Sequence, residues 1–386
     1  MKNQVIREHT IAMVVQLQRI GVLTGGGDCS GLNPAMKWVV KTAMDDPMTK
    51  TRQIHFEVFG IHDGWKGLFD VDPDDSESRA RHIEMLDPDK VRTWDRQGGT
   101  MLGTSRWGPY ESNDLDTSPQ SQKIISNIEH LGLDAIIVLG GNGTLTVAHK
   151  LFQEGVNVIG IPKTIDKDLT ETDYTLGFDT ALNVIVEEVD RLRTTAGSHK
   201  RIFVVETMGR SAGWLALEGG EACGAYIILI PECPYDMKRV CDLISSGRKH
   251  GSRYEIIIVS EAARTIDGKE IVKKEGSDAF GNLTLGGVGE YVASEIQKRT
   301  GQETKSIELS YLQRGGAPGA YDRRMGRYFG IAAVDLVVKK EFGRMVCWKN
   351  GKMSSVPLAK VDGKTNLVNI TTEYDRERYN GRRTIL

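Results

Sequence analysis

The 386-residue sequence has few cysteines and prolines and no long apolar run, and these absences exclude several classes of protein. Its five cysteines are scattered without a Cys-x-x-Cys pair, which argues against a disulfide framework or a zinc site and fits a reducing cytoplasm. No stretch approaches the roughly 18 consecutive apolar residues of a membrane span. Lys and Arg number 50 against 52 Asp and Glu, so a net charge of −2 gives no reason to expect nucleic-acid or membrane partners.

What the sequence does contain is a repeated pattern of short apolar runs, each followed by a glycine or a charged cluster. Near-continuous Ile and Val without polar alternation is typical of strands buried on both faces, and therefore of a mostly parallel sheet covered by helices. The runs are 19–24, 134–139, 156–161, 201–206, 225–230 and 254–260. Ligands bind such α/β sheets at the carboxyl ends of the strands, so the residues after each run are where chemistry is expected.

Three segments stand outside this pattern. The apolar stretch Ile11–Leu17 is short and leads into Arg19 rather than a small-residue cleavage site, so we expect an extension packed on the first domain. The polar stretches 70–90 and 107–122 are predicted to be solvated connections. The C-terminus resembles a basic tail of unassigned role, with four arginines: Arg376, Arg378, Arg382 and Arg383.

Two glycine-rich loops each follow an apolar run and precede helix-like sequence. The first reads TGGGDCSGLN from Thr24 to Asn33, and the second reads GGNGTL from Gly140 to Leu145. Glycine N–H groups and a helix N-terminus together favour bound phosphate. The first loop is not a Walker A loop, and Ser30 stands where a dinucleotide fingerprint needs its third glycine. Two such loops on one sheet predict a polyphosphate held between them.

A third strand end carries paired carboxylates in the segment PKTIDKDL, from Pro162 to Leu169. Asp166 and Asp168, two residues apart, can divide the work of accepting a proton and orienting a metal ion or ligand. A charged surface loop with internal ion pairs is the alternative interpretation.

Three arginines are candidates for binding anions. Arg201 and Arg210 flank a single predicted strand, so they are not expected to touch the same atom within one subunit. Their separation makes sense if one of them reaches a neighbouring subunit. Arg314 precedes a glycine pair, a pattern that suits an anion clamp.

Taken in order, seven segments resemble the 6-phosphofructokinase family. They are GVLTGGGDCSGLN, GGTMLGTSR, LGGNGT, PKTIDKD, TAGSHKR with VVETMGRSAGW, VSEAA and YLQRGGAP, and they extend over about residues 20–322. The resemblance implies an enzyme that moves the terminal phosphoryl group of ATP to the 1-hydroxyl of fructose 6-phosphate, giving fructose 1,6-bisphosphate. It also implies Mg²⁺ on the donor phosphates.

The resemblance further implies roles for individual residues. The catalytic positions, with Asp166 as the base, are Asp166, Thr164, Asp168 and Arg210. The donor-binding positions are Gly26, Arg106, Trp107, Gly140, Gly141, Asn142, Gly143, Thr144 and Lys163. The substrate-binding positions are Thr164, Asp166, Arg201, Met208, Gly209, Arg210, Glu261, Lys305, Tyr311 and Arg314.

Some residues depart from the family pattern. Asn142 stands where the family has an aspartate that helps to hold Mg²⁺, and it offers a neutral oxygen instead. Lys167 replaces an asparagine between the paired aspartates, and we expect its charge to lower the pKa of Asp166 and weaken it as a base. Lys305 and Tyr311 replace an arginine and a histidine of the 6-phosphate site. These departures leave open a different phosphorylated sugar or a catalytically silent, regulatory homologue.

The identity of the donor depends on two positions. Gly143 matches the ATP users of the family, because many pyrophosphate users carry an aspartate there that would repel the nucleotide. Lys163 matches the pyrophosphate users, because a lysine suits a small and highly charged donor. We favour ATP, with pyrophosphate as the alternative.

The resemblance implies two Rossmann-like, three-layer α/β domains with mostly parallel sheets and an active site in the cleft between them. We expect the donor domain at 1–177 with a returning segment at about 313–363, and the sugar-phosphate domain at 178–312 with a C-terminal segment at about 364–386. Arg201 and Lys305 match positions that act across a subunit boundary. A homo-oligomer, either a dimer or a tetramer, is therefore expected.

Overall fold

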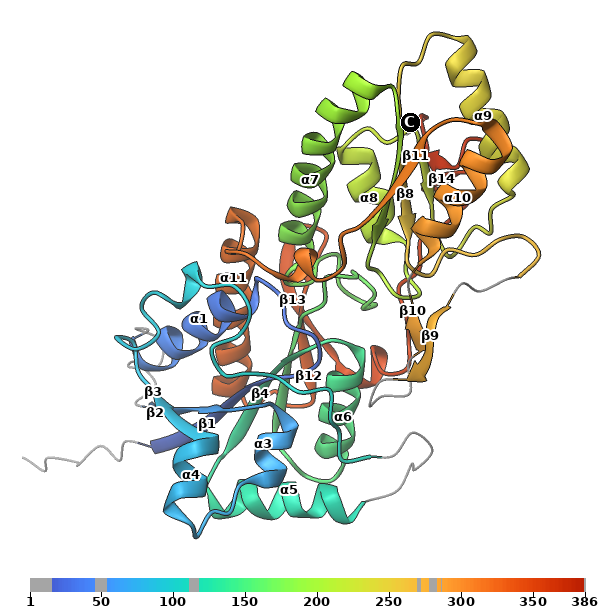
Figure 1. Cartoon of the computed structure of the whole chain (residues 1–386). Helices are drawn as coiled ribbons and strands as arrows, with labels where there is room; N and C mark the ends of the chain where they lie inside the picture. The colour runs from blue at the N-terminus through green and yellow to red at the C-terminus, as the bar shows by residue number, and fades with distance from the viewer. Residues whose placement is uncertain are drawn as a thin grey trace, which may run out of the picture.

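The computed structural model describes residues 16–45, 54–110, 118–268, 272–277, 283–285 and 287–384. Two mostly parallel sheets, each covered by helices, lie in different halves of the molecule (Figure 1). The expected α/β class with mostly parallel sheets is confirmed. The predicted N-terminal extension falls outside the described residues, except that Gln16 and Leu17 begin the first strand.

The larger sheet has seven strands in the order β13-β12-β5-β4-β1-β2-β3. Their bounds are β1 Gln16–Thr24, β2 Ile54–Ile61, β3 Ile83–Leu86, β4 Ala135–Gly140, β5 Val158–Pro162, β12 Arg344–Lys349 and β13 Lys352–Pro357. The five inner strands run parallel, and β3 and β13 pair antiparallel at the two edges. The carboxyl ends of the neighbours β1, β4 and β5 therefore meet at one edge of the sheet.

Alternating side chains of this sheet enter two separate cores. Val22 and Ile137 pack on the face covered by α1 (Leu32–Asp45) and α11 (Ala320–Lys339), which contact each other and the sheet. Leu23, Ile136 and Val138 pack on the opposite face. That face is covered by α3 (Trp65–Asp70), α5 (Pro119–His130) and α6 (Asn142–Gln153). Burial on both faces explains why the apolar runs lack polar alternation.

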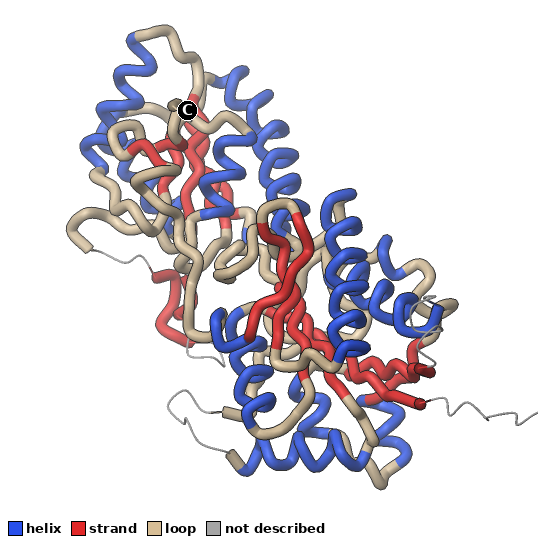
Figure 2. Tube along the Cα trace, turned by 180° about the vertical axis from the view of Figure 1, so that it is seen from behind, coloured by secondary structure: helices blue, strands red, loops and turns tan. Residues whose placement is uncertain are grey.

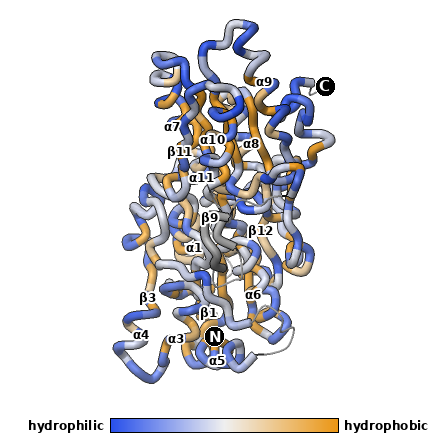
Figure 3. The backbone as a smooth tube through the Cα atoms, turned by 45° about the vertical axis from the view of Figure 1, so that its right-hand side comes forward, coloured by the Kyte–Doolittle hydropathy of each residue, from blue (hydrophilic) through white to orange (hydrophobic). Residues whose placement is uncertain are grey.

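The smaller sheet has four parallel strands in the order β11-β6-β8-β7. Their bounds are β6 Ile202–Thr207, β7 Ile227–Leu229, β8 Glu255–Ser260 and β11 Thr304–Glu308. The helices α7 (Phe178–His199) and α8 (Trp214–Ala222) pack on one face, and α9 (Met237–Lys249) and α10 (Val288–Thr300) on the other. The hydropathy colouring of Figure 3 shows segments of hydrophobic residues inside this half and segments of hydrophilic residues around them.

Short elements complete the chain, and Figure 2 shows how loops join the two halves. They are α4 Ser76–His82, the 3-10 turns η1 Trp94–Arg96, η2 Ser310–Arg314 and η3 Leu358–Lys360, and the strand pairs β9 Val272–Ser277 with β10 Leu283–Leu285 and β14 Tyr374–Asp375 with β15 Asn380–Gly381. None of the described helices is long and apolar enough to cross a membrane. All five cysteines are free and buried.

All six apolar runs form parallel strands, as predicted. The interpretation of 70–90 as a plain connection is wrong, because it contains α4, capped by the Asp75 carboxylate, and the edge strand β3. In 107–122, residues 111–117 lie outside the described part, and Ser118 caps α5 at the end of that stretch. Polar sequence here marks an exposed helix and an edge strand rather than an absence of structure.

Candidate active site

The glycine loops after β1 and β4 meet at the side chain of Thr144. A Cβ atom at Gly25 would lie 2.6 Å from Thr144 Cγ2, and one at Gly140 would lie 2.3 Å from Thr144 Cβ. The N–H of Gly25 also donates to the carbonyl of Leu139 at 2.9 Å. Only glycine fits at these two positions. At Gly141, α6 begins with no side-chain cap, so the N–H groups of its first turn are available to an anion.

Two cations lie against the first glycine loop. The buried ammonium of Lys163 donates to the carbonyl of Gly27, and burial lowers its pKa to about 8. The Arg314 guanidinium donates from Nη1 to the carbonyl of Asp28 at 3.0 Å. A Cβ atom at Gly27 would lie 2.6 Å from that same Nη1. Arg314, which the resemblance assigned to the sugar phosphate, thus contacts the first glycine loop in this structure.

The segment that carries Arg106 and Trp107 is hydrogen-bonded to the same loop. The N–H of Gly26 donates to the carbonyl of Ser105 at 2.9 Å, and the Thr104 hydroxyl donates to the carbonyl of Gly26 at 2.8 Å. Arg106 follows directly and is half-buried. The Trp107 ring packs against Phe69 of α3, with ring centroids 4.8 Å apart. The structure therefore brings Gly26, Arg106 and Trp107 to one place.

The paired carboxylates follow β5 and lie beside the N-terminus of α6. The N–H of Asp166 donates to the Thr164 hydroxyl at 3.1 Å, and both side chains are buried. The Asn142 amide donates from Nδ2 to Oδ2 of Asp168 at 3.0 Å. Burial and the neighbouring charge of Asp166 raise the pKa of Asp168 to about 6. These carboxylates are therefore not the solvated surface loop that was the alternative interpretation.

Three oxygens at this point are buried and lack a hydrogen-bond donor: Oδ1 of Asn142, of Asp166 and of Asp168. A buried polar atom without a partner is costly unless an ion or ligand supplies one. Oxygen ligands suit Mg²⁺, which is commonly held by one or two carboxylates together with substrate phosphates. Among the described residues no group of three or more His, Cys, Asp or Glu side chains forms a metal cage. The oxygens present fit a Mg²⁺ ion that is shared with a phosphate ligand.

The smaller sheet contributes the loop after β6 and the end of β8. The N–H groups of Gly209 and Arg210 donate to Oε1 of Glu261 at 3.2 and 2.9 Å, and the N–H of Met208 donates to Oε1 of Gln313 at 2.9 Å. Burial raises the pKa of Glu261 to about 6, and the charge of Asp166 adds to this rise. Carboxylates from the ends of both sheets thus act on each other.

Arg201 and Lys305 lie away from this site, and Tyr311 lies on η2 with Gln313 and Arg314. Arg201 precedes β6, at the opposite end of the strand from Arg210, and its Nε lies 2.8 Å from Oε2 of Glu303. Lys305 Nζ lies 3.5 Å from Oε1 of the same Glu303, and Tyr311 is 69% exposed. The six residues of β6 span about 20 Å at the usual rise. Arg201 and Arg210 are therefore too far apart for one small ligand in a single subunit.

Comparison with known proteins shows the family to which the chain belongs. A sequence model of the family described as phosphofructokinase matches residues 19–337. The chain belongs to the phosphofructokinase family. It is 44% identical over 351 residues to a pyrophosphate–fructose 6-phosphate 1-phosphotransferase of Dictyoglomus thermophilum, which covers 91% of this chain and 95% of that one. It is 40% identical over 359 residues to an ATP-dependent 6-phosphofructokinase of Chloroflexus aurantiacus, which covers 92% and 94%.

Solved phosphofructokinases share the fold. The structure from Saccharomyces cerevisiae is 30% identical with a TM-score of 0.71 over 89% of this chain, which spans 45% of that longer chain. A pyrophosphate-dependent phosphofructokinase from Marinobacter aquaeolei has a TM-score of 0.76 and 20% identity, covering 95% of this chain and 89% of that one. At that identity the likeness concerns the fold alone.

Lys167, one of the departures from the phosphofructokinase pattern, is directed toward α8. Its Nζ lies 2.6 Å from Oε1 of Glu218. It also lies 4.7 Å from the ring centroid of Trp214 and 5.2 Å from that of Phe178. The positive charge is thus balanced by a carboxylate and two aromatic faces.

Asn366 joins the carboxylate segment to α8. Its backbone N–H donates to the carbonyl of Asp168 at 2.7 Å, and its side-chain Nδ2 donates to the carbonyl of Lys167 at 2.9 Å. Its own carbonyl accepts the Trp214 indole N–H at 3.0 Å. A single residue near the C-terminus therefore holds the backbone of the paired carboxylates against the smaller half of the phosphofructokinase fold.

Sequence reasoning missed three residues of this site. Asn366 and Glu218 lie in segments without any motif, so only the fold brings them to Lys167. Gln313 lies inside the segment YLQRGGAP, where its polarity next to Arg314 was the available signal. It is almost fully buried, and its Nε2 has no hydrogen-bond partner, so it is available to a ligand.

Proposed function

We propose that the protein is a phosphofructokinase that transfers the terminal phosphoryl group of ATP to the 1-hydroxyl of fructose 6-phosphate. The observation that carries the proposal is the placement of Asp166. Toward α6, its neighbour Asp168 accepts a hydrogen bond from Asn142 at the uncapped helix N-terminus; toward the smaller sheet, the charge of Asp166 acts on Glu261, which accepts the N–H of Arg210. A phosphoryl donor on the first side and a sugar on the second would meet at this carboxylate.

In this mechanism the chain positions two ligands and removes one proton. The first-turn N–H groups of α6, with Lys163 and Arg106, bind the donor phosphates. Thr164 contacts the group in transfer, and Met208, Gly209, Arg210 and Glu261 hold the sugar. The unpartnered Oδ1 of Asp166 accepts the proton of the attacking hydroxyl as the new O–P bond forms, while the bond from the terminal phosphorus to the bridging oxygen breaks and ADP leaves.

Mg²⁺ is the proposed cofactor, because the chain offers it suitable oxygens. Asn142 and Asp168 would hold it through their unpartnered Oδ1 atoms. When bound, the ion neutralises charge on the donor phosphates. The Asn142 amide keeps Oδ2 of Asp168 hydrogen-bonded, which orients Oδ1 toward the same space.

Two functional units are proposed around this site. A donor unit would comprise residues 1–177 and the returning segment 313–363, and a sugar unit would comprise 178–312 and 364–386. The return of α11, β12 and β13 to the larger sheet supports this division. So does the packing of β15 beside β7 and α8 of the smaller sheet.

We further propose a cytoplasmic homo-oligomer, a dimer or a tetramer, in which Arg201 and Lys305 reach the sugar phosphate bound to a neighbour. Lys305 lies on the edge strand β11, Arg201 precedes the neighbouring strand β6, and both lie close to the carboxylate of Glu303. Tyr311 and Leu312, which follow the carboxyl end of β11, are 69% and 59% exposed, which suits burial by a second subunit. The five free thiols fit a reducing compartment.

Pyrophosphate is the second candidate donor. The Lys163 ammonium lies buried under the glycine loop, where it would face a compact phosphate donor. Relatives at 42–44% identity are named for pyrophosphate, and relatives at 39–40% identity are named for ATP. Gly143 is the reason to favour ATP, because it leaves the nucleotide without a repelling carboxylate.

The donor is tested by initial rates with fructose 6-phosphate and Mg²⁺, measured in parallel with ATP and with pyrophosphate. A higher kcat/KM for ATP supports the proposal. A higher kcat/KM for pyrophosphate reverses the choice of donor but retains the reaction. If neither donor reacts, the same pair of assays with other sugar phosphates separates a changed substrate from a silent homologue, which would bind ligand without turnover.

A further inference from the structure

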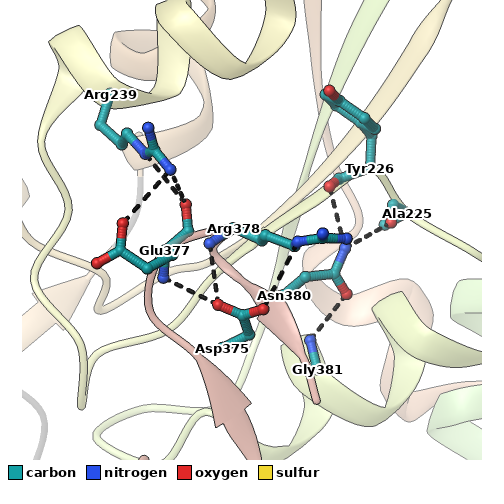
Figure 4. Close-up of polar contacts among 8 residues, drawn as sticks. All are labelled: Ala225, Tyr226, Arg239, Asp375, Glu377, Arg378, Asn380 and Gly381. Carbon is teal, nitrogen blue, oxygen red and sulfur yellow. Dashed lines mark hydrogen bonds and ion pairs between the residues drawn. The ribbon is translucent and has the colours of Figure 1, made fainter. Parts of the chain in front are cut away.

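The basic C-terminus is a fixed hairpin rather than a loose tail. The strands β14 and β15 pair with each other, and the hairpin is hydrogen-bonded to the smaller sheet. The Tyr374 hydroxyl donates to the carbonyl of Ile228, and the N–H of Ile228 donates to the carbonyl of Tyr379 at 2.7 Å. The Asn380 amide donates to the carbonyls of Ala225 and Tyr226 at 2.9 and 3.0 Å (Figure 4). The backbone that carries the basic residues is therefore anchored.

This hairpin lines a cavity of about 680 Å³. Its charged lining consists of the four arginines noted in the sequence and two carboxylates: Arg376, Arg378, Arg382, Arg383, Asp375 and Glu377. The volume falls within the usual range for small-molecule sites. None of its lining residues belongs to the site around Asp166, so the cavity is separate from the proposed active site.

The two carboxylates are already engaged. Asp375 accepts the N–H groups of Glu377 and Arg378 at 3.0 and 3.2 Å, and its Oδ2 lies 3.8 Å from Nε of Arg378 (Figure 4). The Glu377 carboxylate lies 3.4 Å from Nη2 of Arg239 on α9. Both negative charges of the lining are thus balanced by Arg378 and by an arginine from outside it.

The remaining guanidinium groups have no such compensation. Within the described part of the chain, the side chains of Arg376, Arg382 and Arg383 make no ion pair or hydrogen bond. Positive charges gathered around one cavity repel each other, and a multivalent anion removes that repulsion. A guanidinium also matches phosphate oxygens in a bidentate geometry.

We propose that this cavity binds a small anion with two or more phosphate groups, held by Arg376, Arg378, Arg382 and Arg383. Inorganic pyrophosphate, a nucleoside polyphosphate and a sugar bisphosphate share this chemistry. The anchored hairpin fixes the backbone of the four arginines, so less ordering is required on binding. The proposal does not depend on the assignment of the active site.

The test is a calorimetric titration of the full-length protein with pyrophosphate. The double variant Arg382→Gln/Arg383→Gln removes two charges from the lining, and Arg79→Gln/Arg81→Gln removes two exposed charges from α4 as the matched control. We expect the first variant to weaken one binding event at least tenfold and the control to leave it within twofold. Inorganic phosphate is expected to bind this site at least tenfold more weakly than pyrophosphate.

Each result decides the matter. The proposal is supported if Arg382→Gln/Arg383→Gln weakens or removes a binding event of the unmodified protein. This holds whether the unmodified protein shows one binding event or two. Binding that this variant leaves unchanged overturns the proposal, even when the active site binds pyrophosphate normally. Equal weakening in the α4 control also overturns it, because the effect is then general electrostatics. Equal affinities for phosphate and pyrophosphate contradict the requirement for two groups.

Discussion

At the scale of single residues, the proposed chemistry depends mostly on the buried oxygens around Asp166. Oδ1 of Asp166 and of Asp168 lack hydrogen-bond donors, and burial raises the pKa of Asp168 to about 6. Such unpartnered groups are costly for folding and are retained where they serve a ligand. Three substitutions test proton acceptance, Mg²⁺ binding and donor binding separately.

Replacement of Asp166 by asparagine keeps the shape of the side chain and removes the proton acceptor. We expect kcat to fall by about 10²- to 10⁴-fold, the usual contribution of a general base, while KM for both substrates changes little. Initial-rate kinetics measure the loss, and circular dichroism checks that the fold is intact. A kcat within tenfold of the unmodified protein would remove Asp166 from its proposed role.

Replacement of Asn142 by aspartate should make stability depend on Mg²⁺. The variant loses the hydrogen bond from the Asn142 amide to Asp168 and places a further carboxylate beside it. Without Mg²⁺ we expect a loss of about 1–3 kcal/mol in the free energy of unfolding, and the added ion should recover it. Thermal unfolding with and without Mg²⁺ measures this. Equal effects of Mg²⁺ on the variant and on the unmodified protein contradict the proposed ligand set.

The pKa of Lys163 predicts an alkaline limit for donor binding. Burial lowers it from 10.5 to about 8, so the charge that attracts the donor is present below about pH 8 and lost above it. The kcat/KM for the donor should therefore fall as the pH rises through 8, and Lys163→Met should lower kcat/KM and abolish that fall. An unchanged alkaline limb in Lys163→Met would assign the limb to another group.

The lowered pKa of Lys163 also affects stability, but stability should rise with pH where donor binding falls. The folded state releases the Lys163 proton at a lower pH than the unfolded chain, so this residue costs stability while it is charged. The destabilisation by Lys163 therefore decreases, and the free energy of unfolding increases, as the pH rises from about 8 to 10.5. Lys163→Met should unfold at a higher temperature than the unmodified protein at neutral pH, with a smaller difference at pH 10.

At the scale of elements, strand ends from both sheets and one distant segment form the site. Asn366 is the clearest case, because its side chain donates to the carbonyl of Lys167 while its backbone bonds to Asp168 and Trp214. We expect Asn366→Ala to lower kcat about tenfold with KM unchanged, since a small displacement of a reacting group costs rate rather than binding. The exposed Asn369→Ala, three residues further on, is the control.

A parallel fall in both variants, or a rise in KM alone, would give Asn366 a merely structural role. The pH profile of kcat adds a second readout. The remaining activity of Asn366→Ala should follow the same pH dependence as the unmodified protein, because the carboxylates themselves are unchanged.

The sequence was sufficient for the strands that are buried on both faces. Their uninterrupted Ile and Val runs leave few alternatives, and their positions placed the glycine loops and the paired carboxylates correctly. It failed at β2 and β12 and at the edge strands β3, β11 and β13, where exposed or half-buried positions interrupt the apolar pattern. The contact of Arg314 with the first glycine loop was also beyond sequence reasoning, because it depends on packing between segments about 290 residues apart.

At the scale of the whole molecule, the account requires more than one chain for each complete site. Arg201 lies beyond the reach of Asp166 in its own subunit, so we expect light scattering to give a dimer or a larger assembly. Arg201→Ala and Asp166→Asn should each be inactive alone. Mixed and reassembled, they should recover about a quarter of the unmodified activity, because half of random dimers hold one complete site. No recovery from an assembled mixture would contradict the contribution of Arg201 to its neighbour.

The reaction proposed for this chain is phosphorylation of the 1-hydroxyl of fructose 6-phosphate, with Asp166 as the base. The most direct measurement is phosphorus NMR of fructose 6-phosphate, ATP and Mg²⁺ incubated with the unmodified protein and, separately, with Asp166→Asn. We expect the resonances of fructose 1,6-bisphosphate and ADP with the unmodified protein, and an initial rate of their appearance lower by about 10²-fold or more with the variant. Phosphate on another hydroxyl, or equal product from both proteins, would contradict it.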